Sequence, residues 1–94
     1  MIEFLVQRTD GDWFDLPANS DPYRPITIAY QPLGDDGGRL LIAGCEVSFS
    51  SEDPGIQISF HGDISEHLAD QVAREVLERV QSITGQKGQL LRLS

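Results

Sequence analysis

The chemistry open to this chain depends first on its one cysteine and two histidines, Cys45, His61 and His67. A thiolate and two imidazoles are zinc ligands, and a cysteine beside a histidine can act as a nucleophile. The alternation of apolar residues turns Cys45 toward a core, whereas His61 turns outward at the end of its strand. The three side chains are therefore not expected to converge, which argues against both a zinc site and a Cys–His pair.

A cluster of aspartates is the second candidate site. Asp10, Asp12 and Asp15 could offer carboxylates to a cation. The calcium loop of an EF-hand, however, needs acids at alternating positions, a glycine at the sixth and a glutamate at the twelfth. Here Trp13 and Phe14 interrupt the pattern of acids, and no glutamate lies at the twelfth position. The cluster therefore does not predict a specific metal site.

Other catalytic patterns are missing from the sequence. The acidic stretch 35–38 has no lysine and no following helix, so it predicts a hairpin turn and no phosphate loop. No serine lies in a Gly-x-Ser-x-Gly elbow. We therefore predict that the protein is not an enzyme and uses no cofactor and no metal.

The longest irregular stretch, residues 9–25, carries three of the seven aromatic residues. Loops of about 17 residues are long for a compact domain and are often functional. Its aromatic side chains could close one end of the core, or they could form an exposed patch of the kind that dominates protein interfaces. On the second interpretation the partner-binding residues are Trp13, Phe14, Tyr23, Asp10, Asp12 and Asp15.

A long amphipathic helix must support any such loop. Asp63, paired with Glu66, or Ser65 alone could cap its start, and Gly85 supplies its C-terminal cap, which gives about 19 residues. Asp70–Arg74 and Glu75–Arg79 are expected to be ion pairs on its exposed face. Its buried stripe should consist of Leu68, Val72, Val76, Val80 and Ile83, widened by Ala69, Ala73 and Leu77.

Period-two alternation predicts strands over residues 2–8, 26–31, 39–50, 56–61 and 88–93. Gly44, inside the third strand, is expected to mark a bulge or a close contact. The expected inward set is Phe4, Val6, Ile26, Ile28, Leu41, Ala43, Val47, Phe49, Ile56, Ile58, Phe60 and Leu91. The opposite face of the sheet should be exposed to solvent. Its residues are Glu46, Ser48, Gln57, Ser59 and His61.

These elements predict an α+β fold. It should be a two-layer sandwich, with one long amphipathic helix on one face of an about five-stranded, mostly antiparallel sheet, in the order β-β-β-β-α-β. Four strands would form a meander, and the last would join beside an earlier one. Residues 1–94 should form a single domain.

Charge and length narrow the function classes. The net charge is −8, and residues 1–63 carry all of the excess, because residues 64–94 hold four acids and four bases. Such a field disfavours nucleic acid and anionic membranes and favours basic partners, although solubility alone also explains it. No apolar run spans a bilayer, and the first residues lack a signal-peptide pattern. We therefore expect a cytoplasmic protein.

Two functional hypotheses remain. The first is a non-enzymatic, bacterial-type module that binds a basic protein partner, in the manner of immunity or inhibitor proteins. The second is a small-ligand-binding or enzyme accessory domain that uses a pocket between the 9–25 loop and the sheet. A homo-oligomer is compatible with either.

Overall fold

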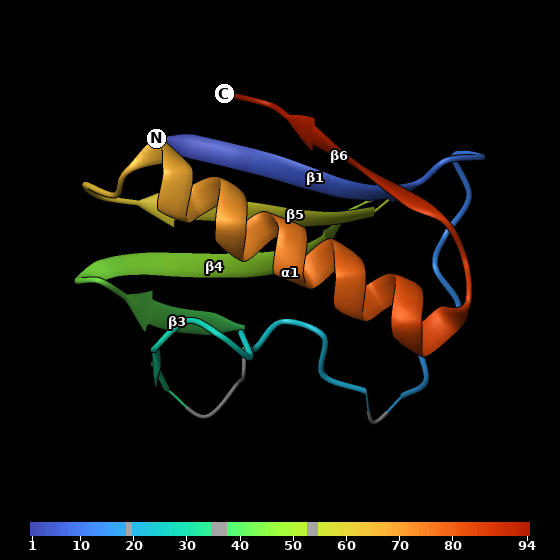
Figure 1. Cartoon of the computed structure of the whole chain (residues 1–94), viewed down its shortest axis with the longest axis horizontal. Helices are drawn as coiled ribbons and strands as arrows, with labels where there is room; N and C mark the ends of the chain where they lie inside the picture. Colours follow the sequence, from blue (N-terminus) through green and yellow to red (C-terminus); the bar gives the residue numbers. More distant parts are fainter. Residues whose placement is uncertain (19, 35–37, 53–54) are drawn as a thin grey trace.

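The computed structural model describes residues 1–18, 20–34, 38–52 and 55–94, so most of the predicted turn at 35–38 lies outside the described residues. One helix packs on one face of a six-stranded sheet, which confirms the predicted α+β architecture (Figure 1). The helix is α1 (Glu66–Thr84). The strands are β1 (Ile2–Arg8), β2 (Gln31–Pro32), β3 (Arg39–Ile42), β4 (Cys45–Glu52), β5 (Gly55–His61) and β6 (Gly88–Arg92).

The strands lie in the order β2-β3-β4-β5-β1-β6, and every neighbouring pair is antiparallel. Strand β1 therefore lies between β5 and β6, with Phe4 opposite both Ile58 and Arg92. The last strand joins beside the first, so the two ends of the chain lie at the same edge region of the sheet (Figure 1).

Helix α1 has the predicted length of 19 residues. Ser65 is its N-cap, because the Ser65 hydroxyl accepts the Leu68 N–H at 3.1 Å. Gly85 ends it in the left-handed conformation, with φ of 70°. The buried stripe matches the prediction except at its end, where Ile83 is exposed. Its fully buried members are Ala69, Val72, Ala73, Val76 and Val80.

The predicted third strand is in fact a hairpin. Strands β3 and β4 are joined by Ala43 and Gly44, which both have positive φ angles, 51° and 77°, the pattern of a type I′ turn. Because this two-residue turn reverses the chain, the even-numbered residues face the core before it and the odd-numbered residues face the core after it. Leu40 and Ile42 are buried in place of the predicted Leu41 and Ala43, while Cys45, Val47 and Phe49 face the core as expected.

The predicted strand at residues 26–31 is wrong. Ile26, expected in the core, is 73% exposed, and strand pairing begins only at Gln31. The backbone of this segment binds the helix: Glu75 accepts the N–H groups of Ile26 and Thr27 at 3.3 and 3.1 Å, and the Thr27 hydroxyl as well. These donors are therefore used by a side chain, so they are not available to a sheet.

The predicted Glu75–Arg79 ion pair is replaced by hydrogen bonds between each side chain and the backbone of the segment before β2. The Arg79 guanidinium donates to the Arg24 and Asp21 carbonyl oxygens, at 3.1 and 3.0 Å. The Asp70–Arg74 pair forms as predicted, at 2.7 Å. The helix face that was expected to be wet thus supports the long loop.

Glu75→Ala should lower the free energy of unfolding by about 1 kcal/mol, because two backbone donors and a hydroxyl lose their acceptor. Glu78→Ala is the matched control, since Glu78 is exposed on the same helix. That control should change stability by no more than about 0.5 kcal/mol. Equal urea midpoints for the two variants would contradict the bracing role of Glu75.

Candidate partner-binding site

The aromatic loop has a fixed position at the end of the sheet, beside the C-terminus of α1. Phe14 is buried in the core. A β-carbon built on Gly88 would lie 2.7 Å from both the Phe14 ring and the Leu77 side chain, which shows how closely the loop, the helix and β6 pack there. A side chain at position 88 would therefore require the Phe14 ring and the Leu77 side chain to shift.

Tyr23 also belongs to the core side of the loop. Its ring is half-buried and stacks on Phe49, with ring centroids 5.1 Å apart and an interplanar angle of 28°. Phe14 and Tyr23 therefore close one end of the core, the first of the two interpretations raised by the sequence. Trp13 differs from both, because 45% of it is exposed.

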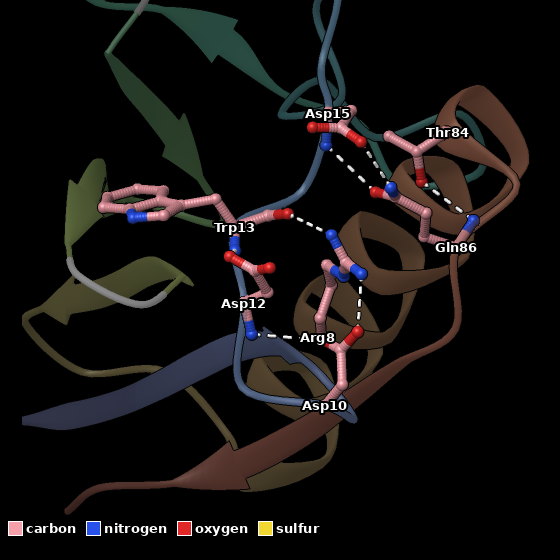
Figure 2. A network of polar contacts seen from close by, with 7 residues as sticks. All are labelled: Arg8, Asp10, Asp12, Trp13, Asp15, Thr84 and Gln86. Carbon is pink, nitrogen blue, oxygen red and sulfur yellow. Dashed lines mark hydrogen bonds and ion pairs between the residues drawn. The ribbon is translucent and has the colours of Figure 1, made fainter.

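A network of polar contacts holds the chain around Trp13 (Figure 2). The Arg8 guanidinium, from the end of β1, donates to the Trp13 carbonyl oxygen at 2.7 Å and to the Asp10 carboxylate at 2.5 Å. Asp10 in turn accepts the Asp12 backbone N–H at 3.1 Å, and Asp12 accepts the Trp13 backbone N–H at 2.9 Å. Arg8 thus fixes the backbone on both sides of a tight turn.

The other side of Trp13 is attached to the end of the helix. Gln86 forms two hydrogen bonds with Asp15: its side-chain oxygen accepts the Asp15 N–H at 2.9 Å, and its side-chain nitrogen donates to the carboxylate at 2.6 Å. The Gln86 N–H is held by the Thr84 hydroxyl, which donates to the Val80 carbonyl oxygen. Figure 2 shows the Trp13 ring pointing away from these contacts, so the network positions the Trp13 backbone without engaging the indole.

The predicted acidic residues are therefore not equivalent. Asp10 is paired with Arg8, and Asp15 is paired with Gln86. Asp12 is exposed, and among the described residues its carboxylate has a hydrogen bond to the Trp13 N–H and no ion pair. Asp12 is consequently the member of the cluster whose charge is most available to a partner.

The pKa of Asp10 is lowered from its ordinary value of 3.8, first by the Asp12 backbone N–H and next by the Arg8 side chain. Because the folded state favours the charged carboxylate, the contribution of Asp10 to stability is present above pH 3.8. It is lost as the pH falls through the lowered pKa. Asp10 therefore keeps its negative charge, and with it the contact to Arg8, throughout the neutral pH range.

A small pocket lies next to Trp13. It has a volume of about 150 Å³ and is lined by Trp13, Phe14, Leu16, Gly55 and Ile56. Pockets for drug-sized ligands usually measure about 300–1,000 Å³. This apolar pocket therefore fits one aliphatic or aromatic side chain better than a whole cofactor.

The residues considered for catalysis or metal binding lie elsewhere. Cys45 is buried, and burial, followed by the charges of Asp63 and Glu46, raises the pKa of its thiol. His61 lies on the open face of the sheet, where its Nε2 is 2.8 Å from the Ser48 hydroxyl. Within the described ranges, no three His, Cys, Asp or Glu side chains gather in a way that could hold a metal ion.

The Ser48–His61 contact pairs a hydroxyl with an imidazole, and the sequence alone did not predict it. It depends on the β4–β5 register, which sets Ser48 opposite Ser59 and Glu46 opposite His61. Glu46, the carboxylate nearest in that register, pairs with Arg39 at 3.2 Å. The pairing is exposed, so it lacks the enclosed setting in which a serine is activated.

Comparison with known proteins leaves the function to be argued from this geometry. No family model, no curated protein and no solved structure matches the chain. Among the described residues, no helix combines the length and the apolar character that crossing a membrane requires.

Proposed function

We propose that the protein is a small, acidic, non-enzymatic module that binds a basic protein partner through the surface around Trp13. The observation that carries this proposal is an exposed tryptophan on a loop whose backbone is fixed on both sides. Tryptophan is among the residues that contribute most to interface energies. A loop that is already ordered loses little conformational entropy on binding.

The surroundings of Trp13 suggest the chemistry of the partner. Asp12 offers a carboxylate without a cationic partner among the described residues, and Asp15, which is bonded to the neutral Gln86 side chain, adds negative charge beside it. The pocket next to Trp13 has room for one apolar side chain. The surface therefore fits a basic protein that presents an apolar residue between its lysines or arginines.

A small-ligand function is the second candidate, and the same pocket is what favours it. Its apolar lining would accept a compound of about the size of benzene, since engineered apolar cavities of 150 Å³ bind such molecules. The two candidates differ in their dependence on salt. Binding of an apolar compound should change little with ionic strength, whereas screening weakens association between opposite charges.

Affinity capture from the native lysate at low and at high salt tests the proposed function. We expect a basic protein to be retained at low salt and released at high salt. Asp12→Asn should slow association with that protein, because charges at the rim of an interface mainly steer encounter. Glu78→Gln, which removes the same charge from the exposed face of α1, is the matched control.

Two results would contradict the proposal. One is an equal loss of association rate in Asp12→Asn and Glu78→Gln, which would show that net charge matters and the site does not. The other is specific binding of an apolar compound beside Trp13 without capture of any basic protein, which would favour the ligand-binding alternative.

A further inference from the structure

Strand β6 is a free edge of the sheet. The strand order places β2 at one edge and β6 at the other, and Figure 1 shows β6 along the outer side of β1. Strand β2 has two residues, one of them Pro32, which has no N–H to donate. Strand β6 has five residues. An edge strand of this length offers a row of backbone donors and acceptors to another strand.

The pairing with β1 determines which groups of β6 are free. The Thr9 N–H donates to the Lys87 carbonyl oxygen at 3.1 Å, and the Leu93 N–H donates to that of Glu3 at 2.8 Å. Antiparallel ladders alternate between hydrogen-bonded and non-hydrogen-bonded pairs. The residues bonded to β1 are therefore every second one, and Leu90, which falls between them, directs its N–H and C=O away from the sheet.

Two leucines and one glutamine, Gln89, lie at this edge on the face opposite the helix. Leu91 was expected in the core, but this prediction is wrong. Leu91 stands opposite Leu5 in the β1 register, one position out of phase with the buried Val6, so it lies on the open face, and Leu90 packs against the core instead. Leu91 is 38% exposed, and Leu93 is 48% exposed. Lysine and charged side chains commonly protect edge strands from pairing, but here two leucines occupy those positions.

The charge distribution indicates what covers this edge. Two copies of a chain with net charge −8 repel each other over most of their surface, but residues 64–94 carry no net charge. The β6 edge belongs to this neutral part. The cationic side chain of β6, Arg92, already pairs with Glu66 at 3.3 Å and lies over the Phe4 ring. The segment that contributes β6 therefore adds no net charge repulsion toward a second copy.

We propose that the protein forms a two-fold symmetric dimer in which β6 pairs antiparallel with β6 of a second copy, centred on Leu90. In this register the two Leu90 residues exchange backbone hydrogen bonds on the axis. Gly88 of each copy lies opposite Arg92 of the other, where the Gly88 carbonyl oxygen accepts the Arg92 N–H, while the Gly88 N–H stays bonded to the Gln81 side chain at 2.9 Å. The two Leu91 side chains are diagonal neighbours, close enough to contact. The interface is isologous, so assembly stops at two copies.

Sedimentation equilibrium over a range of protein concentrations, at low and high salt, tests this dimer. We expect a reversible monomer–dimer equilibrium that added salt strengthens, because salt screens the repulsion between two acidic chains. The double variant Leu91→Lys/Leu93→Lys should raise the dimer dissociation constant at least about tenfold, as a charged edge resists pairing. Ile26→Lys is the control, because it adds a lysine at an exposed apolar position remote from β6.

The direction of the control makes the result decisive. Each lysine reduces the net negative charge of the chain, so the change in overall charge alone would tighten the dimer in every variant. Loss of dimer in the β6 variant, together with an equal or tighter dimer in Ile26→Lys, therefore supports pairing through this edge. A wild-type chain that stays monomeric at millimolar concentration, or one that grows beyond dimers, would overturn the proposal.

Hydrogen exchange on the wild-type protein gives a second readout that needs no variant. The Leu90 amide should become more protected as the protein concentration rises, whereas the Thr27 amide, bonded to Glu75, should not change. A dimer without concentration-dependent protection at Leu90 would place the interface elsewhere and refute the proposal. This outcome is independent of the Trp13 surface, whose partner binding should weaken with salt.

Discussion

Trp13→Ala is expected to weaken binding of the proposed basic partner about 30-fold, the equivalent of about 2 kcal/mol for an interface hot spot. The loss should come mainly from faster dissociation, because anchors act after the encounter. The folded state should change little in stability, since Trp13 is 45% exposed and its backbone contacts do not depend on the indole. Binding kinetics and urea unfolding measure the two effects separately.

Phe14→Ala is the matched control for this prediction. Phe14 is the next residue along the loop but is buried, so its truncation should cost about 3–5 kcal/mol of stability. The wild-type tryptophan emission should be accessible to a soluble quencher. A Trp13→Ala variant that unfolds as easily as Phe14→Ala, or a protected emission in the free protein, would contradict the anchor role.

Val76→Asp is expected to cost about 3 kcal/mol or more in unfolding free energy and to leave much of the protein unfolded. Val76 is 2% exposed in the middle of the buried stripe of α1. A carboxylate there would lose its hydration, and the buried residues that the structure describes include no polar or charged one to compensate. Because small domains are stable by roughly 5–15 kcal/mol, this is a large fraction of the total.

Gln71→Asp is the control for the helix. It introduces the same carboxylate into α1 at an exposed position and should shift the unfolding midpoint only slightly. Circular dichroism during denaturation reports both variants. Similar midpoints would mean that the buried face of α1 has been assigned to the wrong residues.

Local signals in the sequence determined the helix and strands β1, β5 and β6, but not the strand order. The predicted four-strand meander is wrong, because β1 pairs with β5 and β6 and not with β2. The spacing of Val72, Val76 and Val80 fixed the buried face of α1, and Gly85 fixed its end, because both depend on neighbours within a few residues. The alternation in β1 and β5 likewise selected the inward residues Phe4, Ile56 and Ile58. The closure of the sheet by a last strand beside an earlier one also followed from the order of elements.

The tertiary structure decided the features that depend on distant partners. Ile26 alternates like a strand residue, yet its N–H binds Glu75, 49 positions away, and no local pattern encodes that acceptor. Ala43 and Gly44 form a turn in positive φ, which alanine rarely adopts, so the sequence offered no standard hairpin signal there.

In the candidate site, too, local sequence determined some features and distant contacts determined others. The sequence marked Trp13, Phe14 and Tyr23 as a group, because they share a polar loop. Only packing separates them: Phe14 enters the space above Gly88 and Tyr23 stacks on Phe49, while Arg8 and Gln86 hold the backbone so that Trp13 faces solvent. Residue type determined that the loop carries aromatic and acidic side chains, and contacts across the fold determined which of them a partner can reach.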